Sequence, residues 1–254
     1  MGKCLMEDQV KRDICDIGRR MYMSGFVAAN DGNISVKISD NQIITTPAGV
    51  SKGFMTPEML CTIDLKGNVI KGKSKPSSEV KMHLRIYEEN PEIGAVTHSH
   101  SPYATAFAIA RRPMDRALLP EAIVNLGIVP VAEYATPGTK EVSESIAQFV
   151  KDYNSLLLAN HGAVTWGIDL MQAYFRMETL EHYAKILFIT TILGDAKELS
   201  SNDVSNLLEI RKSQGITTGG IPVPHNSTKN KENANEDLLA QKIADMVLKK
   251  LENR

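Results

Sequence analysis

The sequence of 254 residues lacks the features that mark several large classes of protein. Its three cysteines, Cys4, Cys15 and Cys61, are an odd number at no metal-like spacing, which is typical of a reducing compartment where thiols stay free. No run approaches the ~18 apolar residues of a membrane span, and the amino-terminal segment has no apolar signal core. We therefore expect a soluble cytoplasmic protein without a membrane partner.

An excess of charge of either sign is also missing, because the formal net charge is -1. A protein that binds nucleic acid needs a basic field to hold the phosphates, so we expect no nucleic-acid partner. What remains is an ordinary globular composition, 43% hydrophobic and 23% charged, in a chain long enough to bury a sizeable core.

Helix-like and strand-like patterns alternate over residues 1–216, which we expect to form one domain. Apolar residues recur at helical spacing over 7–25 and at a spacing of two over 34–38. Further helices are expected over 79–90, 102–112, 138–153 and 169–194, and further strands over 61–72, 95–100, 128–135 and 155–167. Because several of these strands form hairpins, the pattern predicts an α/β protein with a mixed, largely antiparallel sheet.

The composition changes near residue 217. Residues 217–235 are rich in Gly, Pro, Asn and Lys and predict a flexible linker. Residues 236–254 predict an amphipathic helix, in which Leu239, Ile243 and Leu251 share one face. Two interpretations stay open: the helix folds back on the main domain, or it docks in the groove of a partner protein.

Three histidines stand at the ends of apolar strands. His98 and His100 are two residues apart, so their side chains point to the same side of an extended strand. Taken alone, this pair is more simply read as one surface and one core histidine, because short motifs are weak signals. His161 ends a second apolar run and is followed by Gly162, which leaves room beside the backbone. Three histidines are the ligand count of a catalytic zinc with one open position.

Glu79 follows two serines at a predicted helix start, where backbone N–H groups favour an anion. Taken alone, the pattern favours capping, in which Ser77 or Ser78 caps the helix and Glu79 complements its N-terminus. The serines also suit phosphate, as do the glycines at two strand boundaries, in Gly32-Asn33 and at Gly49. No lysine stands in a P-loop frame, so a nucleoside triphosphate is not expected.

Taken in order, the segments GNIS, TPAG, PSSE, HSH and ANHG resemble the class II aldolase/adducin-like family over about residues 7–216. They are most similar to its zinc-dependent L-fuculose-1-phosphate aldolases. The resemblance implies a three-layer αβα fold and a homotetramer with active sites near subunit interfaces. It also implies one Zn²⁺ per subunit, held by His98, His100 and His161. Mn²⁺ and Co²⁺ suit the same ligands.

Further roles come only from this resemblance. Glu79 is similar to the glutamate that ligates the resting metal and then moves away to act as general base and acid. The resemblance also implies a substrate-phosphate site with these members: Gly32, Asn33, Gly49, Ser77 and Ser78. Because all three histidines and the glutamate are intact, a non-catalytic, adducin-like binding module is the weaker interpretation.

The implied reaction is the cleavage of L-fuculose 1-phosphate, or a similar 6-deoxy or 5-deoxy ketose 1-phosphate, to dihydroxyacetone phosphate and L-lactaldehyde. Rhamnulose, 5-deoxyribulose and 5-methylthioribulose 1-phosphates are alternative substrates of an aldolase. A methylthioribulose-1-phosphate dehydratase of the same fold, or a related decarboxylase, is the alternative reaction.

The chain departs from the fuculose-phosphate aldolases at several positions. Ala48 replaces a threonine of the phosphate loop, which removes a hydroxyl while a backbone N–H is expected to remain for the phosphate. Pro137 and a tyrosine-free stretch over 110–130 stand where two aromatic groups handle the aldehyde. Glu121 is expected to face the open end of the site, or alternatively to be the acid of a helix N-terminus after Pro120.

The tail is a further departure, because simple members of the family end near residue 216. Its linker and helix resemble the encapsulation peptides of enzymes packaged in bacterial microcompartments, whose shells retain reactive aldehydes. A shell protein is therefore an expected partner of residues 236–254, and the interior of a microcompartment is an expected location.

Overall fold

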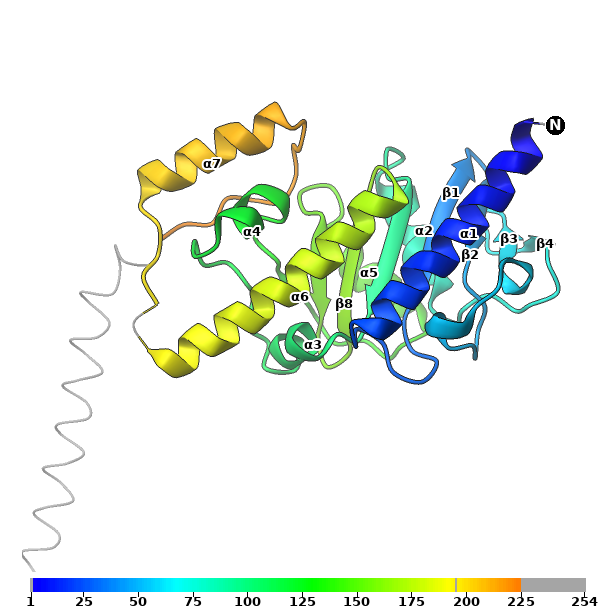
Figure 1. The fold of residues 1–254 in the computed structure, drawn as a ribbon, viewed down its shortest axis with the longest axis horizontal. Coiled ribbons are helices and arrows are strands. Elements are labelled where there is room, and N and C mark those ends of the chain that lie inside the picture. The colour runs from blue at the N-terminus through cyan, green and yellow to red at the C-terminus, as the bar shows by residue number, and fades with distance from the viewer. Residues whose placement is uncertain (1, 195, 225–254) are drawn as a thin grey trace, which may run out of the picture.

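The computed structural model describes residues 2–194 and 196–224, which build one eight-stranded sheet with helices on both faces (Figure 1). The sheet order is β4-β3-β2-β1-β5-β8-β7-β6, and every neighbouring pair is antiparallel except β6 with β7. The predicted mixed, largely antiparallel sheet is therefore confirmed. The strands are β1 (Asn33–Ser39), β2 (Gln42–Thr45), β3 (Cys61–Ile63), β4 (Val69–Lys71), β5 (Ala95–Ser99), β6 (Val131–Ala132), β7 (Ser155–Leu158) and β8 (Gly162–Gly167).

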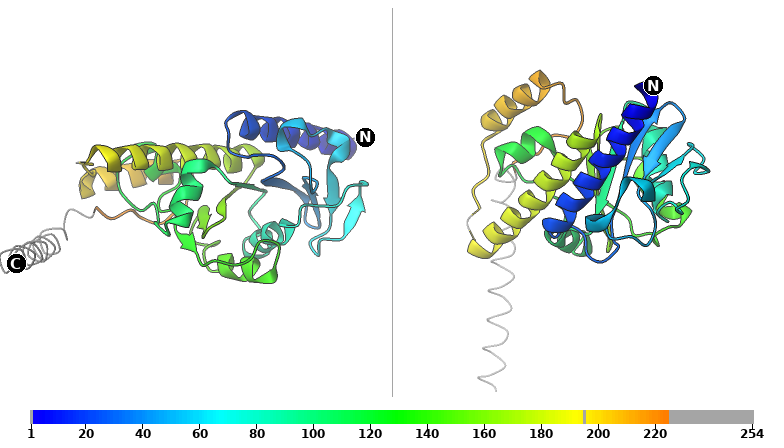
Figure 2. Two further views of the ribbon diagram at one scale, coloured as in Figure 1. Left: turned by 90° about the horizontal axis from the view of Figure 1, so that it is seen from below. Right: turned by 45° about the vertical axis from the view of Figure 1, so that its right-hand side comes forward.

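The helices form the two outer layers. They are α1 (Gly2–Met23), α2 (Val80–Glu89), α3 (Pro102–Ile109), α4 (Pro120–Asn125), α5 (Lys140–Ala147), α6 (Leu170–Leu193) and α7 (Ser201–Ser213), with short 3₁₀ turns η1 (Lys52–Phe54) and η2 (Pro57–Met59). Helices α1, α3 and α6 pack on one face of the sheet, and α2 and α5 pack on the other (Figure 2). This is the expected three-layer αβα arrangement.

Most strands are buried on both faces because helices cover both sides of the sheet. In β1, Ile34 and Val36 face the α1/α6 layer, so Asn33 and Ser35 face the α2/α5 layer. In β7, Leu157 joins the first layer, while Leu156 and Leu158 join the second. The continuous apolar run of β7 thus follows from burial on two sides, as in other fully covered sheets.

Helix α1 shows how a sequence pattern becomes structure. Ile14, Ile17 and Met21 lie on one face of the helix and are almost fully buried. The helix ends at Met23, and Gly25 follows at φ +72°, a left-handed conformation that glycine adopts without a Cβ clash. The predicted helix over 7–25 is confirmed and extends further toward the N-terminus.

Helix α5 and strand β6 are shorter than their sequence patterns predict. After Ala147 the hydrogen bonds change to three-residue turns, from Phe149 N–H to Ile146 and from Val150 N–H to Ala147. These turns place Val150 in the core with no exposed surface. A continued helix follows a regular spiral and does not make this turn, so tertiary packing overrides the helical pattern here.

The first residues of the expected linker are bonded to the domain. Gly219 accepts from the backbone N–H of Ile128 (2.6 Å) and donates to the carbonyl of Asp152 (2.8 Å). Arg211 donates to the carbonyl of Gly220 (2.7 Å). The rest of the linker and the predicted helix over 236–254 lie outside the described residues. Among the residues that the structure describes, no helix is both long and apolar enough to span a membrane.

Candidate metal centre and active site

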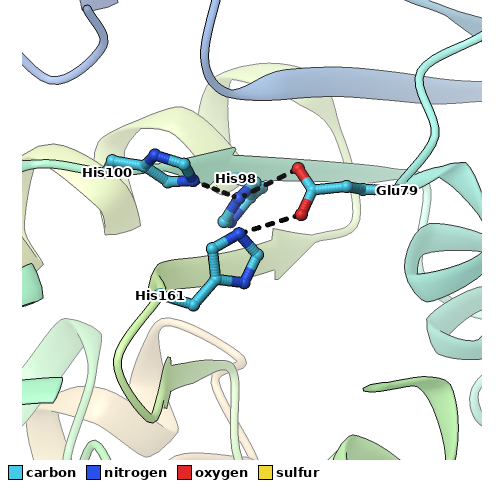
Figure 3. A group of neighbouring side chains, drawn as sticks. All are labelled: Glu79, His98, His100 and His161. Atoms are coloured by element: carbon cyan, nitrogen blue, oxygen red, sulfur yellow. Dashed lines mark hydrogen bonds and ion pairs between the residues drawn. The ribbon is translucent and has the colours of Figure 1, made fainter. Parts of the chain in front are cut away.

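Three histidine side chains meet at one end of the sheet, on the α2/α5 side (Figure 3). His98 lies in β5, His100 directly follows that strand, and His161 lies in the tight turn between β7 and β8. Pairing of β5 with β8 brings the two segments together, with His98 opposite Val164. The ring centroids are 4.7–5.0 Å apart, so the structure brings the three imidazoles together.

Gly162 lets the turn approach β5 closely. A Cβ atom at this position would lie 2.4 Å from the carbonyl oxygen of Ser99 and 2.9 Å from the ring of His100. No side chain fits there without moving the backbone. A glycine is therefore needed next to His161, because the turn packs too closely against β5 to leave room for a side chain.

The tautomers of two imidazoles follow from their outer partners. His98 Nδ1 lies 2.9 Å from the carbonyl oxygen of Ala163, which only accepts, so this nitrogen carries the proton. His100 Nδ1 lies 3.3 Å from a carboxylate oxygen of Asp31 and is held in the same way. The Nε2 atoms of both rings then face each other at 3.2 Å with their lone pairs. Two lone pairs at this distance repel unless a cation lies between them.

Glu79 completes the cluster from the N-terminus of α2. Its Oε1 lies 2.9 Å from His161 Nε2, and its Oε2 lies 3.3 Å from His98 Nε2. The amide of Asn33 donates to Oε2 at 2.8 Å and fixes the carboxylate. Glu79 occupies the N-cap position of α2, but its own side chain makes no capping hydrogen bond. The capping interpretation of Glu79 is therefore wrong, whereas Ser77 Oγ accepts from the backbone N–H of Glu79 at 3.3 Å, as a helix cap does.

The electrostatics of the cluster are those of a site built for a positive charge. Burial raises the pKa of Glu79, but His98 and His161 outweigh it, so that the pKa lies far below its usual range. Burial lowers the pKa of His98, and the Glu79 carboxylate reverses this and raises it overall. For His100, burial together with the neighbouring imidazoles lowers the pKa to about 4. The low pKa keeps His100 neutral at neutral pH, which is the state that a metal ligand needs.

The donor set fits a divalent metal. Three imidazole nitrogens and one carboxylate oxygen lie within 4.8 Å of one another. In a tetrahedral zinc site with bonds of ~2.0–2.1 Å the ligand atoms are roughly 3.3 Å apart, close to the 3.2 Å between the two Nε2 atoms. Asp31 and the Ala163 carbonyl are the outer partners that orient such ligands.

A buried hydrogen-bonded group lies one helical turn from Glu79. Ser35 Oγ lies 2.7 Å from His83 Nδ1 and 2.8 Å from the hydroxyl of Tyr87. Asn33 of β1 bonds to Glu79 of α2, and Ser35 of β1 bonds to His83 of α2. These are two successive contacts between the strand and the helix, because the strand residues are two apart and the helix residues are four apart. Burial lowers the pKa of His83 to about 3.

A cavity of about 260 Å³ opens beside the cluster. The five predicted phosphate-site residues all line it, together with Glu79, His100 and His161: these five are Gly32, Asn33, Gly49, Ser77 and Ser78. Ser77 N–H donates to the carbonyl of Thr46 (3.2 Å), which joins the serine segment to the loop after β2. The structure therefore brings the predicted metal and phosphate residues to one place. Pro137 also lines this cavity.

The expectation for Ala48 needs correction. Its backbone N–H donates to the carbonyl of Lys75 at 2.9 Å, which ties the loop after β2 to the segment before α2. This N–H is already used within the chain, so it is not a free donor for a phosphate.

Two polar residues with clear roles at the cavity are missing from the sequence-based prediction. Asp31 holds His100, and Lys52 lies at the cavity wall with only 1% of its surface exposed. An isolated lysine in an irregular segment is normally exposed, so no pattern marks it. For Asp31 the only indication in the sequence is weak: it directly precedes Gly32, which is a predicted site residue.

Glu121 lies in the first turn of α4, directly after Pro120, and is exposed. This is the helix N-terminal position of the alternative interpretation. Glu121 is not among the residues lining the cavity of its own chain, and its role toward a substrate stays a prediction. Of the other histidines, His83 is buried in α2 and His182 is exposed on α6, while His225 lies outside the described residues.

Comparison with known proteins assigns this arrangement to a family. The model of the Class II Aldolase and Adducin N-terminal domain matches residues 12–188. An L-fuculose phosphate aldolase of Methanococcus maripaludis is 39% identical over 173 residues, which are 68% of this chain and 93% of the relative. A 3-oxo-tetronate 4-phosphate decarboxylase of Pectobacterium atrosepticum is 34% identical over 207 residues, 79% of this chain and 93% of the relative.

A solved structure supports the same assignment. An L-fuculose 1-phosphate aldolase aligns with a TM-score of 0.74 and 32% identity, over 80% of this chain and 96% of that one. The chain belongs to the class II aldolase and adducin family. Aldolases and decarboxylases both break a carbon–carbon bond, and the chain is accordingly a lyase-type enzyme.

Proposed function

We propose that this enzyme cleaves L-fuculose 1-phosphate, or a similar deoxy ketose 1-phosphate, to dihydroxyacetone phosphate and an aldehyde. The proposal rests on one observation: the candidate metal site lies next to the candidate phosphate site. The cluster of Glu79 and three imidazoles borders a cavity whose glycines and serines suit a phosphate group. A ketose phosphate presents a carbonyl and a phosphate a few bonds apart, so it can reach both sites at once.

His98, His100 and His161 are the residues that would hold the metal, with Glu79 as a fourth ligand when no substrate is bound. When bound, the metal supplies a Lewis acid that stabilises the negative charge developing on the substrate oxygens as the carbon–carbon bond breaks. We propose Zn²⁺, one per subunit, on the ligand count. Mn²⁺ and Co²⁺ also suit these ligands.

Glu79 moves the proton in this proposal. As the bond between carbons three and four breaks, the hydroxyl of carbon four loses its proton and becomes the aldehyde, and the electron pair stays on carbon three. Carbon three must then gain a proton to become dihydroxyacetone phosphate. The carboxylate of Glu79 lies at the boundary between the imidazoles and the cavity, where it can carry that proton. Asn33 keeps the carboxylate oriented through its 2.8 Å bond to Oε2.

A coupled assay for dihydroxyacetone phosphate tests the reaction. The zinc-loaded enzyme is given fuculose, rhamnulose and 5-deoxyribulose 1-phosphates, with and without a chelator. We expect the product from at least one of them and expect the chelator to abolish it. Absence of dihydroxyacetone phosphate from all three substrates contradicts the proposal.

A decarboxylase is the second candidate, because a 3-oxo-tetronate 4-phosphate decarboxylase is 34% identical over 79% of this chain. Its substrate also combines a phosphate with a carbonyl beside the bond that breaks, so the same two sites suit it. Release of carbon dioxide from 3-oxo-tetronate 4-phosphate, without formation of dihydroxyacetone phosphate from any ketose, favours this candidate. 5-Methylthioribulose 1-phosphate is the substrate that separates an aldolase from a dehydratase, since only the aldolase forms dihydroxyacetone phosphate.

We also propose a homotetramer, on the family resemblance, and a cytoplasmic location, on the composition. Residues 236–254 are proposed to bind a microcompartment shell protein, on the amphipathic pattern of this segment. A chain ending at Pro224 keeps every described residue, so it should keep full turnover and lose co-purification with shell proteins. Unchanged co-purification contradicts the shell proposal, and a size measurement that shows a monomer contradicts the tetramer.

A further inference from the structure

Lys52 is a buried lysine at the wall of the cavity, and the mechanism proposed above does not use it. Only 1% of its surface is exposed, which is rare for a lysine. Within the described residues, the cavity is lined by no other lysine and no arginine. A phosphate dianion in this cavity would therefore meet a single lysine or arginine side chain.

The backbone of Lys52 is held rigidly by close packing of η1 on α1. Gly18 of α1 lies so close that a Cβ there would be 2.7 Å from the carbonyl oxygen of Lys52. Gly53 packs in the same way, because a Cβ at this position would lie 2.6 Å from the ring of Tyr22. These contacts fix where the lysine stem starts, and the stem runs inward from there.

The ammonium group joins two loops of the cavity. Nζ donates to the carbonyl of Asn30, at 3.0 Å, and to the carbonyl of Val50. The first loop carries Asp31 and Gly32, and the second carries Ala48 and Gly49, so both belong to the wall that surrounds the phosphate site. An ammonium has three N–H groups, and these two bonds leave one for a ligand.

The positive charge of Lys52 needs an explanation, because a lysine is rarely buried. Burial lowers the pKa of Lys52 to about 8, although Asp31 and Glu79 act in the opposite direction. Keeping a cation in such a place costs stability unless an anion joins it. Ala48 cannot replace this charge, because it has no hydroxyl and its N–H is already bonded to Lys75.

We propose that Lys52 is the cationic group of the phosphate subsite, where its ammonium fixes two loops and contributes positive charge to the substrate's phosphate. The inference rests on the proposed function for the identity of that substrate. A lysine acts on phosphate as a point charge, without the fixed geometry of an arginine fork. Lys52 is therefore expected to affect the binding of phosphorylated molecules and to leave the bond-breaking step almost unchanged.

Titration of zinc-loaded enzyme with inorganic phosphate, followed by calorimetry, tests the inference. Lys52→Met keeps the apolar stem and removes the charge, and it should weaken the Kd for phosphate at least tenfold. Lys52→Arg keeps the charge and should weaken it less. Lys75→Met is the matched control, because Lys75 is exposed in the segment next to the cavity and does not line it. A Kd within twofold of wild type for Lys52→Met overturns the proposal.

Kinetics separate a phosphate contact from a structural clamp. Lys52→Met should raise the KM for the ketose phosphate about tenfold while kcat falls less than threefold. Turnover of the phosphate-free ketose should fall much less than turnover of the phosphorylated one. An equal loss with the phosphorylated and the phosphate-free ketose overturns the proposal, since a distorted loop harms both.

A measurement on wild-type enzyme covers the case in which Lys52→Met does not fold. Between pH 8 and pH 10 the lysine loses its proton, so the phosphate Kd should weaken at least tenfold, while Lys52→Arg should change much less. The charged groups facing Nζ are Asp31 and Glu79, with His100 and His161 across the cavity, and the arginine variant shares all of them. Parallel pH curves for the two proteins overturn the inference.

The two proposals fail in different ways. If no ketose phosphate is cleaved but phosphate binding depends on Lys52, the subsite stands and the proposed reaction falls. If a ketose phosphate is cleaved and Lys52→Met binds phosphate like wild type, the reaction stands and the role of Lys52 falls.

Discussion

The metal cluster and the phosphate cavity share Glu79, His100 and His161, yet the two are built by different means. The cluster is made of side chains placed by regular elements, at the end of β5, in the β7–β8 turn and at the start of α2. The cavity is made largely of loop segments after α1 and β2 and before α2. Regular elements fix side chains through local periodicity, whereas loops depend on contacts with distant segments.

The largest effect is expected from breaking the cluster alone. His98→Ala should lose the metal and lower kcat about 10³-fold or more, because a Lewis acid contributes several kcal/mol and each ~1.4 kcal/mol is tenfold in rate. Metal content and turnover are the measurements. His182→Ala is the control, since His182 is exposed on α6, and it should match wild type. A metal-loaded, active His98→Ala enzyme contradicts the ligand assignment.

The second effect separates proton transfer from metal binding. Glu79→Gln keeps the shape of the side chain and its contact with Asn33 but cannot carry the proton, so kcat should fall about 10²–10⁴-fold. The metal should stay partly bound by the three imidazoles. Metal analysis and single-turnover rates check both points, and normal turnover of this variant rules out Glu79 as the base.

The third prediction compares two glycines of the cavity wall. Gly32 and Gly49 both adopt left-handed φ values, +73° and +72°. A Cβ on Gly32 would lie 2.5 Å from Val27 and 2.9 Å from the carbonyl of His98, whereas a Cβ on Gly49 meets nothing within 4 Å. Gly49→Ala should therefore cost only the conformational strain of about 1–2 kcal/mol.

Gly32→Ala should cost more than that strain and should weaken metal binding as well, because it displaces β5 at His98. Urea unfolding and metal content distinguish the two variants. Equal loss of stability in both variants, with the metal retained, would show that the loop and the strand are not coupled at Gly32.

The smallest effect on activity is expected at the buried group one helical turn from Glu79, where the change appears as a pH dependence of stability. His83 has a pKa of about 3 in the folded protein against 6.5 as its ordinary value. Between these values the unfolded state binds more protons, so stability falls as the pH drops through this window, by about 1.4 kcal/mol per pH unit from this group.

His83→Gln removes that proton uptake. Relative to wild type, its free energy of unfolding should decline less steeply between pH 6.5 and pH 4.5 in urea titrations. His182→Gln, at an exposed position, should run parallel to wild type. If the stability curve of His83→Gln also runs parallel to that of wild type, His83 does not take up a proton on unfolding, which contradicts the prediction.

The same contrast explains how far the sequence predicts the structure. The spacing of His98 and His100 places both side chains on one side of a strand, and an apolar strand end locates His161. Periodicity carries no information on which partner a polar side chain chooses. The pattern around Glu79 therefore favours capping, whereas its carboxylate faces the histidines. Asn33 lines the cavity, and its side-chain amide also donates to the Glu79 carboxylate.

Loop features were less predictable for the same reason. Lys52 gains its position from the packing of η1 on α1, which depends on Gly18 and Gly53 at distant points of the chain. The N–H of Ala48 is bonded to Lys75, a partner 27 positions away that no local pattern indicates. The αβα class and the sheet type were predictable, while the early end of α5 was not, because burial of Val150 decides it.

The anchoring of Gly219 has a practical consequence. Gly219 is bonded to Asp152, just before β7 begins, whereas His161 follows the other end of that strand. A label, surface tether or fused protein joined after Pro224 would thus follow a segment anchored at the end of β7 opposite His161. We expect an enzyme immobilised through this point to keep its activity.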